Sequence, residues 1–151
     1  MKIEAVLFDM DGLMVDTESL STKALISSAK KQDYEMTREE TLQVLGFTEA
    51  AIYKFWEDYF EDNHVDGKKL ADDHYDYIEE VLFTTGPDKM PNVEELLVYL
   101  KENNYKVAVA SSSNIDHIEN NMKKTRLRKY IDKIASGQEV SNGKPAPDVF
   151  L

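Results

Sequence analysis

The 151-residue chain contains no cysteine, a single tryptophan, six glycines and four prolines. Without cysteine it has no disulfide framework and no thiolate chemistry. No stretch approaches the ~20 apolar residues that a membrane-spanning helix needs. The first residues, Met1 and Lys2, lead directly into a predicted strand, which is not the pattern of a secretory signal. These absences lead us to expect a cytoplasmic protein.

Basic residues are scarce relative to acidic ones, with 18 Lys and Arg against 29 Asp and Glu and a net charge of −11. Phosphate backbones and anionic lipid surfaces repel such a chain, so we expect neither a nucleic-acid partner nor a membrane partner. Residues 16–84 hold 7 basic and 17 acidic residues, whereas the rest of the chain holds 11 and 12. This shift in charge predicts two modules, one inserted into the other.

The predicted elements outside residues 16–84 alternate between strand and helix. Near-continuous apolar runs predict buried strands at 3–8 and 106–110, and the patterns between and after them predict helix 91–100, helix 115–125 and strand 131–136. Strands connected through helices form parallel sheets. The sequence therefore predicts an α/β fold with a Rossmann-like parallel sheet core formed by residues 1–15 and 85–151. The last residues, 144–151, are predicted to enter a further helix.

The segment 16–84 shows no strand pattern and predicts a small helical bundle. Its four helices are expected at 17–34, 37–45, 48–60 and 67–82. Thr37 followed three residues later by Glu40 is typical of a capping box at a helix start. Tyr53, Trp56 and Phe60 share one helix face, which predicts bundle core rather than a ligand platform. No pair at metal-ligand spacing occurs among the three histidines, His64, His74 and His117.

Two carboxylates, Asp9 and Asp11, follow the first predicted strand in a loop that contains Gly12. Ligand sites of open α/β sheets lie beyond the carboxyl ends of the strands. Close carboxylates raise each other's pKa and cost stability, which a metal ion or a reaction usually offsets. An EF-hand is excluded, because its fifth and twelfth loop positions would be Leu13 and Leu20. The alternative is that one of the two acids caps a helix.

Two further polar residues, Ser111 and Lys144, follow predicted strands. Ser111 could cap the next helix, and the free N–H groups of a helix start also bind anions. Lys144 alone would be a surface lysine, but Pro145 and Pro147 restrict the chain beside it. Phosphoryl transfer needs a nucleophile, a proton shuttle and cationic or N–H groups for the phosphoryl oxygens.

The order of these motifs closely resembles the haloacid dehalogenase superfamily, in its helical-cap phosphatase and β-phosphoglucomutase branch. The resemblance covers nearly the whole chain and is carried by DMDGLMVDTE, MPNVEELLVYLKENNYKVAVASSS and GKPAPDVF. It implies a haloacid dehalogenase-like core and an inserted all-helical cap. The cap is formed by residues 16–84 and acts as a mobile lid. It also implies a Mg²⁺-dependent phosphatase of small phosphorylated metabolites.

The resemblance assigns a role to each polar residue of the predicted core. Asp9 would be the nucleophile that attacks phosphorus, and Asp11 the general acid and later the general base. Ser111 and the backbone N–H of Ser112 would hold phosphoryl oxygens, while Lys144 would neutralise charge between the phosphate and Asp9. Mg²⁺ would be bound by Asp9, the carbonyl of Asp11 and the substrate.

The first departure from the family concerns its fourth motif, an acidic pair that completes the metal site and would fall beyond Leu151. We expect that the chain is a fragment and that residues 1–151 alone are poorly stable and nearly inactive. The alternatives are an enzyme that lacks one metal ligand, or an inactive or phosphate-binding remnant.

The second departure lies in the helical segment, at Gly46, Thr48 and Glu49, where substrate selection is expected. β-Phosphoglucomutases carry an arginine at the position of Glu49, and a carboxylate there would repel a second phosphate. Phosphatase activity is therefore favoured, and hexose phosphate mutase activity is the alternative. The sequence indicates neither the exact substrate nor the oligomeric state.

Overall fold

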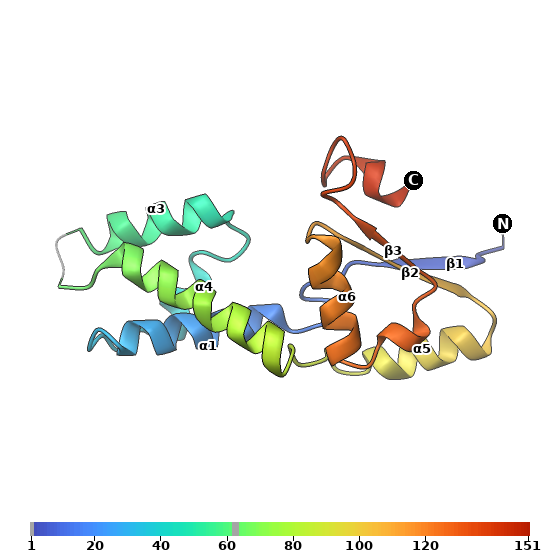
Figure 1. Ribbon diagram of the computed structural model, residues 1–151, viewed down its shortest axis with the longest axis horizontal. Helices are drawn as coiled ribbons and strands as arrows, with labels where there is room; N and C mark the ends of the chain where they lie inside the picture. Colours follow the sequence, from blue (N-terminus) through green and yellow to red (C-terminus); the bar gives the residue numbers. More distant parts are fainter. Residues whose placement is uncertain (1, 62–63) are drawn as a thin grey trace. The chain divides into compact units, whose positions relative to one another are not determined.

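The computed structural model describes residues 2–61 and 64–151 (Figure 1). The chain divides into two units, a sheet unit of residues 1–17 and 82–151 and a helical unit of residues 18–81. These limits differ from the expected domain boundaries by two residues at one junction and three at the other. Residues 1, 62 and 63 fall within the expected domains but lie outside the described residues.

The sheet unit is built on three parallel strands, β1 (Ala5–Phe8), β2 (Lys106–Ser111) and β3 (Lys133–Ser136). Their order is β1-β2-β3, and the register places Phe8 beside Val109 and Val109 beside Ile134. Helices α5 (Val93–Glu102) and α6 (Ile115–Lys124) connect the strands and lie on one side of the sheet in Figure 1. The predicted α/β fold with a parallel sheet is confirmed.

The core of the sheet unit lies on one face of the sheet. It comprises buried side chains from the strands and helices, among them Phe8, Val107, Val109, Leu97, Ile118 and Met122. Alternate residues point to the opposite face, where Leu7 of β1 is 44% exposed. The expectation that β1 is a buried strand is therefore wrong in part. An apolar run cannot show whether both faces of a sheet are covered, and the buried core described here lies on one face alone.

Four helices form the helical unit, which contains no strand within the described residues. They are α1 (Thr17–Lys30), α2 (Arg38–Leu42), α3 (Glu49–Tyr59) and α4 (Gly67–Thr84). Trp56 and Phe60 are buried in their common core and Tyr53 packs against it, so the prediction of an aromatic bundle core is confirmed. Gly67 lets the backbones of α4 and α3 approach each other closely, because a Cβ at this position would lie 2.2 Å from the Trp56 carbonyl oxygen. No helix of the described chain has the length and apolarity to cross a membrane.

Helix boundaries differ from the sequence-based ones where the stop signal is weak. The capping box is confirmed: the Glu40 N–H donates to Thr37 Oγ1, and the Thr37 N–H donates to Glu40 Oε2 at 2.7 Å. Helix α1 ends at Lys30 rather than near residue 34, since Asp33 adopts a left-handed conformation with φ of 57°. The helix expected within residues 144–151 is a short 3₁₀ turn, η2 (Pro147–Phe150), and another, η1 (Arg128–Tyr130), precedes β3.

The two segments that lead into and out of the helical unit pair with each other inside the sheet unit. The Asp16 N–H donates to the Asp88 carbonyl at 2.9 Å, and the Met90 N–H donates to the Met14 carbonyl at 3.0 Å. An antiparallel bridge between Val15 and Lys89 lies between these hydrogen bonds. The connection is therefore a short two-stranded ribbon rather than two independent linkers.

Candidate active site

The parallel strands bring the predicted catalytic residues to the carboxyl edge of the sheet. Asp9 follows β1 directly, and Asp11 lies two residues further on. Ser111 is the last residue of β2, the strand beside β1. Gly12 has φ of 71°, which allows the chain to turn so that the Gly12 N–H donates to the Val15 carbonyl at 2.9 Å. Residues far apart in the sequence thus meet at one edge.

Lys144 reaches this edge from the segment after β3. Its Nζ donates to Asp9 Oδ1 at 2.7 Å and to the Ala110 carbonyl oxygen at 2.9 Å. The side chains of Lys144 and Asp9 are 24% and 49% exposed, so the ion pair is partly shielded from water. The Phe150 ring centroid lies 5.4 Å from the same ammonium group. The lysine is therefore held at the carboxylate by several groups.

Asp11 lies among hydroxyl groups. Its Oδ2 accepts hydrogen bonds from Ser111 Oγ at 3.3 Å and from Ser113 Oγ at 3.5 Å. Burial raises the pKa of Asp11 above its ordinary value and the negative charge of Asp9 adds to the effect, while hydrogen bonds from Thr17, Ser111 and Ser113 oppose it. A carboxyl group with a raised pKa holds its proton more readily, as a general acid must.

The loop after β2 is braced by the end of β3. The Ser113 N–H donates to Ser111 Oγ at 3.1 Å, and the Gly137 N–H donates to the Ser111 carbonyl at 2.7 Å. Ser136 Oγ donates to the Ser113 carbonyl at 2.7 Å. Ser112 is exposed at the tip of this loop. Backbone groups on both sides thus fix the conformation of the segment that is expected to bind phosphate.

The helix cap considered for Ser111 belongs to another residue. Asn114 is the N-cap of α6, and its Oδ1 accepts a hydrogen bond from the His117 N–H at 2.9 Å. The Ser111 hydroxyl is instead shared between Asp11 and the Ser113 N–H. Ser111 is therefore a member of the polar cluster at the sheet edge rather than the cap of the following helix.

The donor set at this edge fits Mg²⁺ in chemistry. Asp9 supplies carboxylate oxygens and Asp11 supplies a carboxylate and a carbonyl, the hard oxygen ligands that Mg²⁺ prefers. Over residues 2–61 and 64–151, no group of three or more His, Cys, Asp and Glu side chains is placed to hold a metal. Two protein residues fit a cation that takes its other ligands from phosphate and water. The predicted metal site remains a prediction.

The residues expected to select substrate lie together in the helical unit. Gly46 lies between α2 and α3 with φ of 78°. Thr48 is the N-cap of α3, where its Oγ1 accepts the Ala51 N–H at 3.4 Å, and Glu49 is the first residue of that helix. All three expected residues are exposed. Thr48 therefore has a local structural role in addition to any role in recognition.

Sequence reasoning missed three residues of the polar cluster. Thr17 and Ser113 bond to Asp11, and Ser136 holds the loop that contains Ser113. The run of three serines at the end of β2 was a signal for Ser113, since the chain turns there and any of the three could face Asp11. Nothing in the sequence singled out Ser136, because its contact depends on the pairing of β2 with β3.

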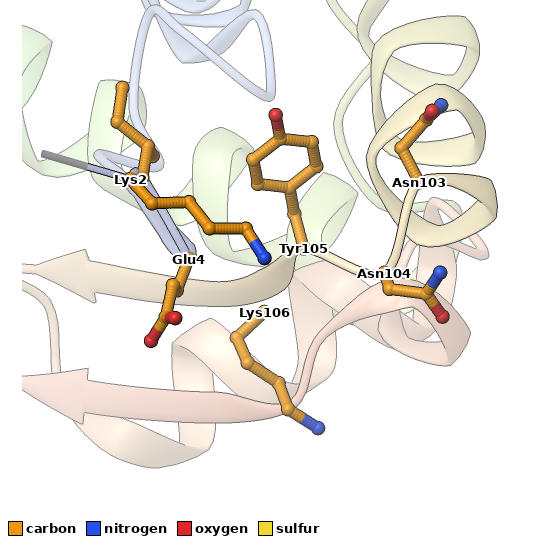
Figure 2. Close-up of a pocket in the computed structure, with 7 residues that line it drawn as sticks. Lys2, Glu4, Asn103, Asn104, Tyr105 and Lys106 are labelled. Carbon is orange, nitrogen blue, oxygen red and sulfur yellow. The ribbon is translucent and has the colours of Figure 1, made fainter.

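A pocket of about 630 Å³ lies at the opposite, amino-terminal ends of β1 and β2 (Figure 2). Its lining residues are Lys2, Ile3, Glu4, Asn103, Asn104, Tyr105 and Lys106. Figure 2 shows the Lys2 side chain extending toward Tyr105. The pocket contains none of the predicted catalytic residues. Because ligands of parallel sheets bind at the carboxyl ends of the strands, we assign it no part in the reaction.

Comparison with known proteins yields relatives along almost the whole chain. It is 28% identical over 151 residues to the phosphorylated carbohydrates phosphatase of Thermotoga maritima, covering 99% of this chain and 68% of that protein. It is 30% identical over 152 residues to the chloroplastic protein SUPPRESSOR OF QUENCHING 1 of Arabidopsis thaliana, covering 99% of this chain but 14% of that protein.

Among solved structures, a Thermotoga maritima protein described as a "putative beta-phosphoglucomutase" matches with a TM-score of 0.80 and 27% identity. The match covers 98% of this chain and 68% of that one. The chain thus spans about two thirds of the length of both Thermotoga proteins and a small part of the Arabidopsis protein. Residues 6–151 match the model of the haloacid dehalogenase-like hydrolases, and the chain belongs to this family.

Proposed function

We propose that this chain carries the catalytic residues of a Mg²⁺-dependent phosphatase that acts on small phosphorylated metabolites in the cytoplasm through a phospho-aspartate at Asp9. One observation supports this most directly: Lys144 Nζ lies 2.7 Å from Asp9 Oδ1, while Asp11 accepts a hydrogen bond from Ser111. Four residues separated by up to 135 positions therefore form one cluster. The similarity to a phosphatase of phosphorylated carbohydrates agrees with this substrate class.

In the first half of the reaction, Asp9 attacks the phosphorus atom of a phosphate monoester. Lys144 holds Oδ1, so Oδ2 forms the new bond while the bond from phosphorus to the ester oxygen breaks. Asp11, whose raised pKa favours the protonated form, donates its proton to the leaving oxygen. The Ser111 hydroxyl and the Ser112 N–H hold phosphoryl oxygens, and the Lys144 ammonium balances their charge.

In the second half, Asp11 acts as a base. Its carboxylate removes a proton from water, the resulting oxygen attacks phosphorus, and the bond to Asp9 breaks to release inorganic phosphate. The hydroxyl groups of Thr17, Ser111 and Ser113 stabilise the carboxylate form that this step requires. Mg²⁺, held by Asp9 and the Asp11 carbonyl, would supply further positive charge to the phosphoryl oxygens.

We assign substrate selection to the helical unit, as a lid whose exposed residues Gly46, Thr48 and Glu49 contact the substrate. Lids of this kind exclude water and commit the substrate to reaction. The Glu49 carboxylate repels a second phosphate, which an arginine at this position would bind, so substrates with one phosphate are favoured. Exchange of Glu49 for Arg should lower the KM for bisphosphates and leave the KM for monophosphates nearly unchanged.

The test of the nucleophile is Asp9→Asn in the protein, assayed with an aryl phosphate and Mg²⁺. The amide cannot attack phosphorus, so turnover should fall to background while the circular dichroism spectrum is unchanged. Asp76→Asn on α4, an exposed carboxylate outside the sheet unit, is the matched control and should retain activity. Substantial turnover by Asp9→Asn would exclude Asp9 as the nucleophile.

A second candidate function is isomerisation of a hexose phosphate, supported by the structural match to the protein described as a phosphoglucomutase. The cluster at the sheet edge suits both reactions, because both pass through a phosphorylated aspartate. A coupled assay that follows conversion of β-glucose 1-phosphate to glucose 6-phosphate, with hydrolysis measured in parallel, discriminates between them. Conversion much faster than hydrolysis would establish the mutase and would leave Glu49 without a role in excluding a second phosphate.

A further inference from the structure

Asn142 and Gly143, directly before Lys144, form the one pair in the sequence in which an asparagine precedes a glycine. Every other asparagine precedes a residue that carries a side chain. An asparagine loses ammonia when the backbone nitrogen of the next residue attacks its side-chain amide carbon. A glycine at that position obstructs the attack least, because it has no Cβ. The pair therefore marks the segment that leads to Lys144 as a candidate for spontaneous chemical modification.

The structure leaves this pair open to such an attack. Both residues are exposed, and neither belongs to a helix or strand. Among the described residues, none accepts a hydrogen bond from the Gly143 N–H. A Cβ built at Gly143 meets no atom within 4 Å, so there is room for the ring that the attack forms. The attacking nitrogen is therefore accessible and takes no part in the backbone hydrogen bonding of the described fold.

The Asn142 side chain is held by Asp148 of η2. Asn142 Nδ2 donates to Asp148 Oδ2 at 3.0 Å, and the Asn142 N–H donates to the same oxygen at 3.2 Å. Both hydrogen bonds are exposed, and exposed contacts in loops open far faster than an amide loses ammonia, so they slow the reaction without preventing it. The two bonds close the segment between residues 142 and 148, and they therefore also hold Lys144 in place.

We propose that Asn142 is a site of spontaneous deamidation, and that this reaction releases Lys144 from Asp9. The Gly143 nitrogen attacks Cγ of Asn142 and gives up its proton, the bond from Cγ to Nδ2 breaks, and ammonia leaves with that proton. The product is a succinimide ring. Water then opens the ring at either of its two carbonyl carbons, which yields aspartate or isoaspartate at position 142. Water is the only other reactant, and no electrons are transferred.

Deamidation turns the contact between Asn142 and Asp148 from attraction into repulsion. In the aspartate product an oxygen replaces Nδ2, the donor that lies 3.0 Å from Asp148 Oδ2, and two carboxylates at such a distance repel each other. Isoaspartate instead adds a carbon atom to the backbone before Gly143. Either product opens the segment that places Lys144 Nζ 2.7 Å from Asp9 Oδ1. The expected loss of turnover rests on the proposed function, whereas the modification and the release of Lys144 do not.

The test of the modification is to age the protein for several days at mildly alkaline pH and to map its peptides by mass spectrometry. The peptide that contains Asn142 should gain the mass difference between NH and O and separate into two forms, faster than any other asparagine peptide. Gly143→Ala, whose Cβ meets no atom within 4 Å, should slow the reaction about tenfold, or about 1.4 kcal/mol in the barrier. An Asn142 peptide that ages no faster than the others, or equally fast in Gly143→Ala, would overturn the proposal.

The release of Lys144 is measured by the rate at which an amine-acylating reagent labels its side chain, with the exposed Lys54 of α3 as the internal reference. Labelling of Lys144 should rise severalfold in aged protein and in Asn142→Asp, while labelling of Lys54 stays constant. Combining Asn142→Asp with Asp148→Asn restores a donor opposite a carboxylate, so the double variant should label like wild type.

Labelling of Lys144 that does not change in aged protein or in Asn142→Asp, or that the double variant fails to restore, would overturn the link between deamidation and Lys144. Phosphatase assays on the same samples should show turnover falling as the aged fraction grows and staying high in Gly143→Ala. Neither the peptide masses nor the labelling depends on turnover. A wild-type protein without phosphatase activity would therefore contradict the proposed function and leave this test decisive.

Discussion

Acidification should destabilise the helical unit through His74. This side chain is 1% exposed on α4, and its Nε2 lies 2.9 Å from Ser21 Oγ of α1. Its Nδ1 has no hydrogen-bond partner within the described structure. Burial alone lowers the pKa of His74 from 6.5 to about 4. The folded protein therefore keeps the imidazole neutral at pH values where the unfolded chain already binds a proton.

The magnitude follows from these two pKa values. The unfolded state binds more protons below pH 6.5, so the free energy of unfolding falls as the pH drops and stops falling below about pH 4. A shift of one pKa unit corresponds to about 1.4 kcal/mol, so the loss is about 1 kcal/mol at pH 5.5 and about 2–3 kcal/mol at pH 4.5. The limiting value is about 3 kcal/mol.

Urea unfolding between pH 7.5 and pH 4.5 measures this loss, and the fluorescence of Trp56 is a suitable signal. Trp56 is the sole tryptophan of the chain and is buried in the helical unit. His74→Gln keeps a polar side chain but cannot titrate, so it should lose about 2–3 kcal/mol less than wild type at pH 4.5. Carboxylates titrate in both proteins and cancel in the difference.

His117→Gln, at an exposed histidine, is the matched control and should behave like wild type. Equal losses of stability in wild type and His74→Gln over this range would refute the reasoning. They would mean that the unit opens or takes in water around the imidazole before the chain unfolds.

Three further predictions concern stability and the pH dependence of catalysis. Gly67→Ala places a Cβ 2.2 Å from a backbone carbonyl oxygen of α3 and should cost about 1–3 kcal/mol in urea unfolding, whereas Gly143→Ala meets no atom within 4 Å and should be neutral. Thr37→Ala removes the capping box and should cost about 1 kcal/mol, and Thr37→Ser should restore most of the loss. Thr17→Val removes a hydrogen bond that lowers the pKa of Asp11, so the pKa of Asp11 should rise. The alkaline limb of the plot of kcat/KM against pH should then move to higher pH, and a limb that stays or moves to lower pH contradicts Asp11 as the general acid.

Local signals in the sequence predicted the elements well. The apolar run before Ser111 became β2, and the spacing of Thr37 and Glu40 became the capping box that it predicts. The end of α1 was misplaced, because an aspartate in a left-handed conformation ends it without the glycine that usually marks such a stop. Burial of β1 was also misjudged, since exposure depends on what covers each face of the sheet rather than on the strand itself.

The residues of the candidate site divide in the same way. Asp9, Asp11, Ser111 and Lys144 could be selected from the sequence because strand ends and restrictive prolines marked them, and the structure brings them together. Thr17 and Ser136 act through contacts that depend on turns and strand pairing, so no local pattern revealed them. Sequence reasoning finds groups that strands deliver to an edge, but it misses the groups that hold them there.

The paired segments around Val15 and Lys89 make the helical unit a replaceable module. A backbone hydrogen bond joins Asp16 to Asp88, so the two ends of the helical unit are held together within the sheet unit. Residues 18–81 can therefore be treated as one long loop inserted into the sheet unit. Closure entropy grows slowly with loop length, and insertions are tolerated where the two ends lie close together. A larger, smaller or unrelated helical module can therefore be grafted at this junction while the strand pairing that brings Asp11 to Ser111 stays intact. Related proteins can therefore differ in their helical units and still keep the same catalytic residues at the edge of the sheet.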